Sequence, residues 1–387
     1  MIDEEALKVL YRLHRHGHLA YLVGGSVRDL LLGKVPKDFD VATNAHPHEI
    51  HALFKNSRII GRRFRLVHVF FKGGKVVEVS TFRSHSEFEE ILTDDGRILK
   101  TDNFGTPEED ALRRDITING LFYNIEDFTI IDYVGGKADL DCRMIRMIGP
   151  PDEKCRQDPV RMIRVIRHAA RTGFQIEEET YQAILRHREE IKKCSSSRVR
   201  DEFLRELKEG AAAPSLQLMI ETGLLFSLFP DLQRTLGNSA ISGQKNRKLL
   251  LSLFSTIDRL VKARRPIPES ILYACFVSVF MRGLLLDHPF VGKREQSHYR
   301  TQTIRWAVNH LLNPFSFPRS SKETTIQVLT AQSTLRHVIQ TGVVPRRLWK
   351  KKYFKEAVLF FGIEAEATRR NIPAMIRRTM PRDFLPR

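Results

Sequence analysis

The sequence predicts an α+β protein in which a part with a small mixed sheet is followed by an all-helical remainder. Over roughly the first 150 residues, short segments rich in β-branched and aromatic residues alternate with helical patterns. From about residue 155 onward, apolar residues recur every three or four positions. The 387 residues are 42% hydrophobic and 28% charged, which is typical of a globular chain with two or three domains.

Five segments of the first part have the pattern of strands: Ala20–Val23, Asp38–Ala42, Arg65–Phe71, Lys75–Phe82 and Thr129–Val134. Helical patterns lie between them at Val27–Leu32 and His48–Phe54. Ser84–Thr106 is polar and rich in Asp and Glu, which predicts a mobile loop.

The charge balance favours a polyanionic partner, either nucleic acid or an anionic membrane surface. Lys and Arg number 63 against 46 Asp and Glu, giving a net charge of +17. The stretch Pro345–Arg387 alone holds 12 Lys/Arg and 4 Asp/Glu. No apolar run approaches the roughly 18 residues of a membrane span, and the N-terminus has neither a secretory signal nor a transit peptide. We therefore expect a cytoplasmic protein with no membrane partner.

The cysteine spacing does not predict a metal or disulfide framework. Cys142, Cys155, Cys194 and Cys275 are 13, 39 and 81 residues apart, which fits neither a zinc motif nor a compact set of disulfides. We expect reduced thiols and no zinc.

A glycine turn is the first feature that suggests chemistry. The segment Leu22–Gly33 reads as a strand, a Gly24-Gly25 turn and the start of a helix. Gly25 would let the backbone approach a phosphate closely, and the amides at a helix N-terminus favour an anion. Arg28, in the first turn of this helix, could clamp the same phosphates.

Two carboxylates follow this turn. Asp38 and Asp40 are separated by one residue, and on a strand such residues point to the same face. A pair of carboxylates can hold Mg²⁺, which bridges triphosphate oxygens. By itself, such a pair of carboxylates more often lies at a solvated strand end. The glycine turn alone is equally weak evidence for a nucleotide site. Their order and spacing together make a strong signal for nucleotide chemistry.

Leu22–Gly33 with Asp38–Thr43 resembles the first motif of the class II nucleotidyltransferases of the polymerase β superfamily, the group of bacterial poly(A) polymerases and CCA-adding enzymes. This resemblance implies a polymerase β-like catalytic head at residues 1–150. It implies a helical neck that binds nucleotide and RNA at 151–230, and a helical body with a basic RNA-binding tail at 231–387. It also implies two Mg²⁺ ions on Asp38 and Asp40, ATP as substrate and RNA 3′ ends as partner.

Two further segments resemble motifs of the same family. Arg113–Gly120 is similar to its Arg-Arg-Asp-Phe-Thr-x-Asn motif, with Ile116 where Phe is usual. The resemblance implies that Arg114 meets the nucleotide and that Asp115 is an active-site carboxylate. Asp132–Leu140 resembles the motif that links head to neck, and we assign it no chemistry. Glu78 is either a third carboxylate near the metals or an exposed strand residue.

A fourth motif begins a helix at Gln157. We expect Asp158 as the N-cap and Pro159 as the first helical residue. Arg161, Arg164, His168 and Arg171 would then line one face. The segment resembles the family's Glu-Asp-x-x-Arg motif, with Gln157 where Glu is usual. The resemblance implies that Asp158 and Arg161 select the base, while Arg164 and Arg167 support the nucleotide.

Hydrogen-bond chemistry agrees with that role. Adenine and cytosine each present an amino donor beside a ring-nitrogen acceptor, which a carboxylate and a guanidinium complement. Guanine and uracil present the reverse order and would leave buried polar groups unpaired, at about 1–3 kcal/mol per group. Asp158 and Arg161 therefore suit ATP or CTP.

The choice between the two activities depends on Ile59–Val69. This stretch, with Arg62 and Arg63 after Gly61, closely resembles the one that marks bacterial poly(A) polymerases. We therefore expect template-independent addition of AMP to RNA 3′ ends with release of pyrophosphate. A CCA-adding enzyme is the near alternative, and a catalytically silent RNA-binding protein is the distant one. RNA-degradation machinery remains an open candidate partner.

Overall fold

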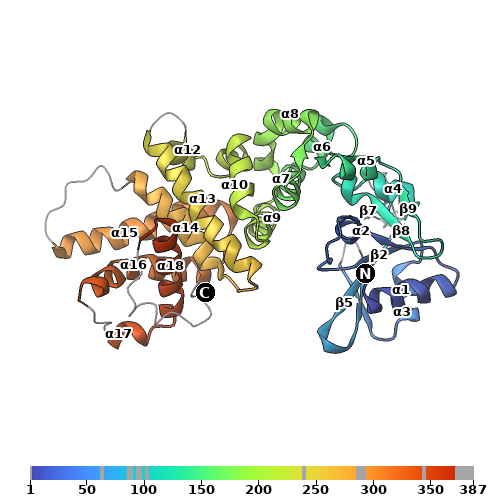
Figure 1. Cartoon of the computed structure of the whole chain (residues 1–387), viewed down its shortest axis with the longest axis horizontal. Helices are drawn as coiled ribbons and strands as arrows, with labels where there is room; N and C mark the ends of the chain where they lie inside the picture. The colour runs from blue at the N-terminus through green and yellow to red at the C-terminus, as the bar shows by residue number, and fades with distance from the viewer. Residues whose placement is uncertain are drawn as a thin grey trace. The chain divides into compact units, whose positions relative to one another are not determined.

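The computed structural model describes residues 2–61, 65–84, 90–92, 98–100, 104–237, 241–284, 293–341 and 346–370. The chain divides into two compact units (Figure 1). The first comprises Met1–Lys154 and Phe174–Thr180, and the second comprises Cys155–Gly173 and Tyr181–Arg387. The separate neck and body that we expect within the helical part stay a prediction.

A seven-stranded sheet organises the first unit. Its strands are β1 (Ala20–Val23), β2 (Asp40–Thr43), β3 (Ser57–Ile60), β4 (Leu66–Phe70), β5 (Val76–Thr81), β8 (Leu121–Asn124) and β9 (Ile130–Asp132). Their order is β3-β4-β5-β2-β1-β8-β9. All neighbours are antiparallel except β2 and β5, which run parallel. The predicted mixed sheet is confirmed.

Short helices connect these strands. They are α1 (Glu4–Arg15), α2 (Gly25–Leu31), α3 (Pro47–Leu53), η1 (Lys72–Gly74), α4 (Pro107–Leu112), η2 (Thr117–Asn119) and α5 (Gly136–Asp141). Asp3 starts α1, because its carboxylate accepts the backbone N–H groups of Glu5 and Ala6. A cluster of Val23, Ala42, Phe82, Ala111 and Phe122 buries one region of the sheet beneath the helices.

The structure differs from the sequence prediction in three places. β2 begins at Asp40 rather than Asp38, because the last residue of its partner β1 is Val23, which pairs with Asp40. Strands β3 and β8 were not predicted. Within the segment expected to be a loop, β6 (Glu90–Leu92) and β7 (Ile98–Lys100) form an antiparallel hairpin. The remainder of residues 85–103 lies outside the described residues, as do Arg62 and Arg63.

The second unit is helical, as predicted. Around the boundary lie β10 (Met144–Ile145), α6 (Pro151–Gln157), α7 (Val160–Thr172), β11 (Gln175–Ile176) and α8 (Glu178–His187). They are followed by η3 (Arg188–Lys193), α9 (Ser196–Lys208), α10 (Ala212–Glu221), α11 (Leu224–Leu228), α12 (Leu232–Leu236), α13 (Ile241–Lys262), α14 (Glu269–Leu284), α15 (Lys293–Leu312), η5 (Asn313–Phe315), α16 (Arg319–Thr341), α17 (Arg346–Trp349) and α18 (Phe354–Ala367).

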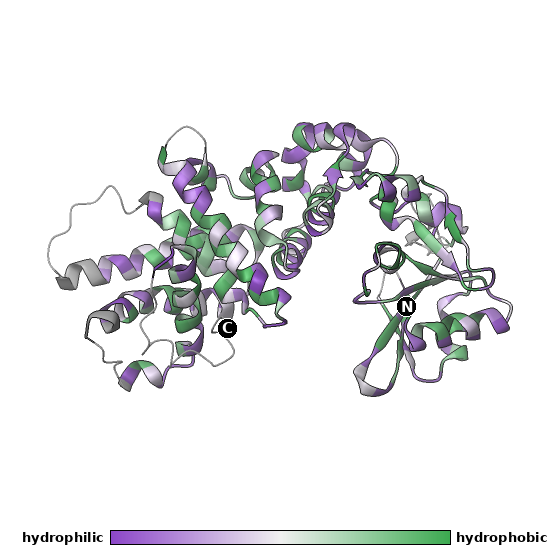
Figure 2. Cartoon of the chain, in the orientation of Figure 1, coloured by the Kyte–Doolittle hydropathy of each residue, from purple (hydrophilic) through white to green (hydrophobic). Residues whose placement is uncertain are grey.

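Hydrophobic residues of these helices lie on the faces that meet, and hydrophilic residues lie outward (Figure 2). Phe203, Phe229 and Phe276 pack with ring centroids 5.3 to 6.0 Å apart and join α9 to α14. None of the helices in the described ranges is long and apolar enough to cross a membrane.

The segment that follows β9 has a structural explanation. The Asp132 carboxylate accepts the backbone N–H groups of Val134, Gly136 and Lys137 at 2.9 to 3.0 Å, and so satisfies amides at the start of α5. Gly136 lies against η2, where a Cβ would be 2.2 Å from the carbonyl oxygen of Thr117.

We therefore predict that Gly136→Ala destabilises the first unit by about 2 kcal/mol, because backbone must move to admit the methyl group. Thermal unfolding followed by circular dichroism measures the loss. Gly135→Ala is the matched control, since a Cβ there would meet nothing within 4 Å and only its φ of +76° opposes substitution. Equal losses in the two variants would contradict the close approach of α5 to η2.

Candidate active site

The middle of the sheet brings the predicted catalytic residue Asp40 next to the glycine turn and to Glu78. Val23, the last residue of β1, pairs with Asp40, the first residue of β2, so the Gly24 turn lies beside Asp40. On the other side of β2, Asp40 pairs with Glu78 of β5. Glu78 in turn pairs with His68 of β4, whose Nε2 lies 3.5 Å from its carboxylate. The register thus places carboxylates from two parallel strands next to each other.

The pKa of Asp40 reflects the groups that surround it. Although solvent reaches Asp40, its packed surroundings raise the pKa of its carboxyl from 3.8 to about 6. The charges of Glu78 and Asp38 raise this pKa further, whereas Arg114 lowers it. Asp38 precedes the strand but is near enough to act on Asp40. Glu78, which the sequence left undecided, therefore belongs to this group of acids.

The Gly24 turn approaches Arg114 closely. Gly24 has a φ of +73°, and a Cβ on it would lie 3.1 Å from Nη1 of Arg114. Arg114 is fixed by two hydrogen bonds to Asp110 at 2.8 and 3.2 Å and by one to the carbonyl of Asn119. Its guanidinium also lies 5.1 Å from the ring centre of Phe122. This positions a half-buried cation between the glycine turn and Asp40.

Arg28 has a different environment from the one that the sequence suggested. Its side chain is only 1% exposed, and it donates to the carboxylate of Asp29 at 2.7 and 2.9 Å. A further bond of 2.6 Å joins it to the side chain of Asn119. Arg28 thus stabilises α2 and the Gly25 turn through its hydrogen bonds to Asp29 and Asn119. Direct contact of Arg28 with a triphosphate stays a prediction, and this burial weighs against it.

Asp115 is half-buried, and its carbonyl accepts the backbone N–H of Ile148. Its role as an active-site carboxylate stays a prediction. Asp110, which holds Arg114, was missed; its spacing of four residues before Arg114 was the available signal.

Asp38 and Asp40 suit a Mg²⁺ ion that is shared with substrate phosphates better than a metal ion that is bound by protein side chains alone. In the described part of the chain, no three His, Cys, Asp or Glu side chains come close enough to form a metal site. Mg²⁺ takes oxygen ligands and is commonly held by one or two carboxylates together with substrate phosphates. Desolvation raises the pKa of Asp40 most, and repulsion by Glu78 and Asp38 adds to it; a divalent cation would relieve this repulsion. The donor set therefore fits this metal.

The second unit contains the predicted base-selecting pair. Asp158 Oδ2 accepts a hydrogen bond from Nη2 of Arg198 on α9 at 2.7 Å and lies 3.8 Å from Nε of Arg161. The predicted N-cap is wrong, because α7 begins at Val160 and the Asp158 side chain makes no capping bond. Its carboxylate is engaged by a guanidinium instead, which is a stronger partner than an amide. Arg198 had no signal in the sequence.

Asp158 also has an unused acceptor. Its Oδ1 is buried and has no hydrogen-bond partner among the described residues. A buried acceptor without a donor costs about 1–3 kcal/mol, so this oxygen is suited to a donor that arrives with a ligand.

Arg167 belongs to a buried charge network in the second unit. It is 5% exposed and donates to Glu202 at 2.5 Å, with Glu209 3.9 Å away. Burial raises the pKa of the neighbouring Glu206 well above its usual range, and Arg167 partly offsets this. These contacts join α7 to α9. Arg164 on the same helix is half-buried. The predicted support of the nucleotide by Arg164 and Arg167 stays a prediction.

Segments in both units of this chain match known protein families. Residues 20–146 match the family described as "Poly A polymerase head domain", and residues 173–236 match "Probable RNA and SrmB- binding site of polymerase A". Poly(A) polymerase I of Haemophilus influenzae is 40% identical over 374 residues, which cover 94% of this chain and 81% of that protein. Poly(A) polymerase I of Salmonella typhi is 43% identical over 279 residues, which cover 70% and 59%.

The match to the Escherichia coli poly(A) polymerase I is 48% identical and covers 51% of that protein. The chain thus spans between a half and three fifths of the length of the Escherichia coli and Salmonella typhi relatives. Among solved structures, the Bacillus stearothermophilus CCA-adding enzyme in complex with CTP is similar with a TM-score of 0.67 and 26% identity. That similarity covers 98% of this chain and 82% of the other.

The raised pKa of Asp40 predicts how its charge affects stability. Because the folded state favours the protonated form, the contribution of Asp40 to stability is full below pH 3.8 and is lost as the pH rises through about 6. In metal-free buffer, we expect Asp40→Asn to raise the Tm by about 2 °C at pH 7.5. This difference should shrink toward zero near pH 4, as measured by calorimetry.

Asp127→Asn is the control, and we expect it to change the Tm in the opposite direction. The hydroxyl and backbone N–H of Thr129 donate to Asp127 and hold the pKa of its carboxyl below the usual value. Its replacement should lower the Tm at neutral pH. A destabilised Asp40→Asn at pH 7.5 would contradict the crowding of acids around Asp40.

Proposed function

Because the chain belongs to the family of bacterial poly(A) polymerases and CCA-adding nucleotidyltransferases, we propose that it is a template-independent poly(A) polymerase. It transfers AMP from ATP to the 3′ hydroxyl of RNA and releases pyrophosphate. The observation that carries this proposal is the strand register, which pairs Asp40 with Val23 beside the Gly24 turn and with Glu78 of β5. The charges of Asp38 and Arg114 also act on Asp40.

In the proposed reaction, the residues of the first unit bind the metal ions and the triphosphate. Asp38 and Asp40 would hold two Mg²⁺ ions, which when bound lower the pKa of the RNA 3′ hydroxyl and neutralise the leaving pyrophosphate. Asp40 must be ionised for this, so its raised pKa predicts loss of activity below about pH 6 in limiting Mg²⁺. Arg114 and the amides after Gly24 bind triphosphate oxygens, because both present N–H donors beside Asp40.

The residues of the second unit select the base. Arg198 and Arg161 orient the Asp158 carboxylate, and its unpartnered Oδ1 accepts the amino group of adenine. Arg161 supplies the donor for the adjacent ring nitrogen. Uracil and guanine would meet acceptor with acceptor at Asp158, which disfavours them.

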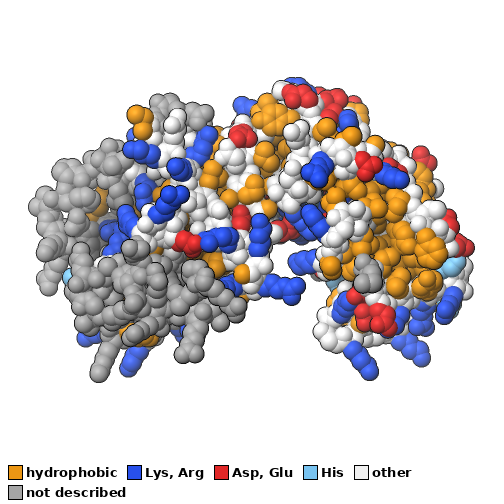
Figure 3. Space-filling view, viewed as in Figure 1, with side chains coloured by type: hydrophobic (Ala, Val, Ile, Leu, Met, Phe, Trp, Pro, Cys, Tyr) orange, Lys and Arg blue, Asp and Glu red, His pale blue; other side chains and the backbone are white. Residues whose placement is uncertain are grey.

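RNA binding is assigned to the helical part. Residues 173–236 match a family described as an RNA-binding site, which supports a neck at 151–230 that meets RNA and nucleotide. Lys and Arg side chains are spread over the described surface of the helical unit that Figure 3 shows. Phosphate contacts of this kind give affinity with little sequence choice, as a growing tail requires. An RNA-binding role of the basic segment Pro345–Arg387, a cytoplasmic location and degradation-machinery partners stay predictions.

The decisive experiment uses an unstructured oligonucleotide and a tRNA lacking its CCA end. Each is incubated with Mg²⁺ and ATP or CTP, and the products are sized on a denaturing gel. We expect long ladders with ATP on both RNAs. Asp38→Ala should reduce addition by at least about a thousandfold, since positioning and charge stabilisation supply most of the rate. RNA binding by this variant should change less than about twofold.

Other outcomes distinguish the alternatives. Addition that stops after three nucleotides, requires CTP and occurs only on tRNA would establish a CCA-adding enzyme, the activity named for the similar Bacillus stearothermophilus structure. RNA binding without incorporation of any nucleotide would establish a catalytically silent protein. Full activity of Asp38→Ala would overturn the site itself.

Arg161→Ala tests base selection. We expect the ratio of kcat/KM for ATP to that for UTP to fall about tenfold, because one charged hydrogen bond of roughly 1.4 kcal/mol is lost only for adenine. Arg171→Ala is the matched control on the same helix, ten residues further along and 36% exposed in its side chain, and should leave the ratio unchanged. An unchanged ratio in Arg161→Ala would exclude Arg161 from the base pocket.

A further inference from the structure

A groove of about 810 Å³ lies on the first unit, between α1 and the residues 54–56 and 69–71 that follow α3 and end β4. It contains none of the residues assigned above to catalysis or base selection. The α1 residues in its lining recur every three or four positions from Glu4 to His16, so they form one face of that helix. The buried residues of α1 lie on its opposite face: Ala6, Val9, Leu10 and Leu13.

The groove is basic. Its lining holds four cations and one carboxylate: Lys8, Arg12, Arg15, Lys55 and Glu4. Glu4 is paired with Lys8 at 2.8 Å, and the nearby Asp3 and Glu5, which are not in the lining, are both paired with Lys75. The other three cations of the lining are exposed, and none of them forms an ion pair with a described residue. This charge is complementary to that of a polyanion.

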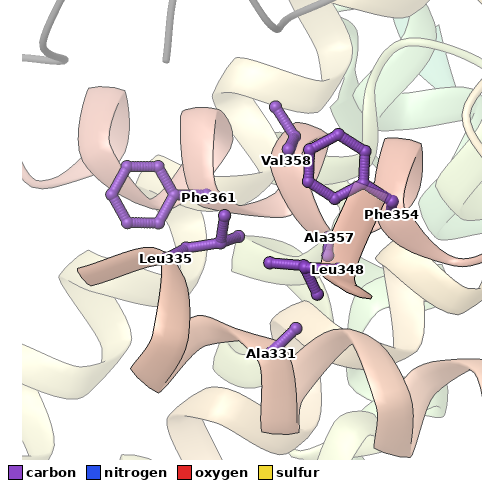
Figure 4. Close-up of a cluster of buried hydrophobic side chains, with 7 residues drawn as sticks. All are labelled: Ala331, Leu335, Leu348, Phe354, Ala357, Val358 and Phe361. Atoms are coloured by element: carbon purple, nitrogen blue, oxygen red, sulfur yellow. The ribbon is translucent and has the colours of Figure 1, made fainter. Parts of the chain in front are cut away.

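Aromatic rings are accessible beside these charges. Tyr11 is 41% exposed and Phe70 is 36% exposed, and both line the groove. By contrast, Phe354 and Phe361 of α18 are 6% and 5% exposed, because they pack in the hydrophobic cluster that Figure 4 shows. The exposed rings of the groove are available to a planar ligand, and every nucleobase has a face that can stack on such a ring.

The two sides of the groove are held together. The guanidinium of Arg12 lies 5.3 Å from the ring centre of Phe54, which joins α1 to the end of α3. The side-chain amide of Asn56 donates to the carbonyl of Phe70 at 2.8 Å, and the carbonyl of Asn56 accepts the backbone N–H of Phe70 at 2.9 Å. The backbone on both sides is therefore fixed, which limits the ordering that binding would require.

One end of the groove lies near the candidate active site. Phe70 is two residues after His68 on β4, and their ring centroids are 6.2 Å apart. His68 pairs with Glu78, which pairs with Asp40. The groove therefore begins two residues along β4 from the row of strand residues that contains Asp40. A single strand whose 3′ end reaches Asp40 would be able to continue into the groove.

We propose that this groove binds single-stranded RNA upstream of the 3′ end that receives AMP. Bases would stack on Tyr11 and Phe70, and backbone phosphates would lie against Arg12, Arg15 and Lys55. Exposed rings beside cations favour a nucleic acid over an acidic peptide, since an acidic peptide needs only the cations. The proposal rests on RNA being the substrate, as proposed above, and adds a second, non-catalytic RNA contact in the first unit.

The test measures equilibrium binding of an unstructured RNA oligonucleotide to the full chain by fluorescence anisotropy without ATP. Tyr11→Ala should weaken binding about fivefold, because one stacked base is lost, whereas Tyr11→Phe keeps the ring and should bind like the wild type. Arg15→Gln combined with Lys55→Gln should reduce the steepness of log affinity against log salt by about 1.4, because two phosphate contacts are lost. The matched control combines Lys137→Gln with Arg143→Gln, two exposed cations of the same unit outside the groove, and should leave the slope unchanged.

A second measurement locates the RNA on the chain. The same oligonucleotide carrying 4-thiouridine is cross-linked to the wild-type chain by light, and the attached peptides are identified by mass spectrometry. We expect cross-links in peptides that contain residues 4–16, 54–56 or 69–71. Cross-links confined to the helical unit, or equal slopes in the two double variants, would overturn the groove as an RNA site.

Two further outcomes are distinguished. If an oligoglutamate peptide of equal charge abolishes the cross-links in the groove as effectively as unlabelled RNA does, the groove recognises charge alone, which overturns its assignment to RNA. Neither assay needs nucleotide incorporation. An inactive chain that gives the expected binding results would therefore contradict the proposed function alone, whereas a chain that adds AMP without them would contradict the groove alone.

Discussion

The register of three strands is the constraint on which the candidate active site depends. Val23 pairs with Asp40, and Asp40 pairs with Glu78, so a turn and two acids from distant parts of the sequence meet in the middle of the sheet. A shift of one residue in β2 would move Asp40 to the opposite face of the sheet. Val41, the next residue of β2, is fully buried on the opposite face, and such a shift would move it to the face that now holds Asp40.

Asp40 is costly to ionise at this position: desolvation raises its pKa most, and the charges of Glu78 and Asp38 raise it further. The charge of Arg114 lowers the pKa of Asp40 and so offsets part of this cost. Hydrogen bonds to Asp110 and Asn119 and a contact with the ring of Phe122 hold Arg114 in place. Arg28 is on the next element but is buried and bonded to Asp29 and Asn119. The two arginines therefore differ in role, and their burial distinguishes them. The buried Arg28 supports the glycine turn, whereas the half-buried Arg114 lies near the acids.

The helical unit uses arginine in the same two ways. Arg167 is buried among Glu202, Glu206 and Glu209 and joins α7 to α9. Breaking such a buried pair leaves uncompensated charge and is strongly destabilising. Arg161, a turn and a half earlier on α7, lies near Asp158 instead.

The sequence by itself determined the α+β class, five of the seven strands of the sheet and the motifs around Asp38, Asp40, Arg114 and Asp158, because these depend on local periodicity and on spacings within short segments. Only the tertiary structure decided which groups meet. The pairing of Asp40 with Glu78 joins residues 38 positions apart, and the hydrogen bond from Arg198 to Asp158 joins residues 40 positions apart. The sequence also could not tell buried from exposed arginines. Burial is set by what packs against a helix face, and local patterns specify the face but not its partner.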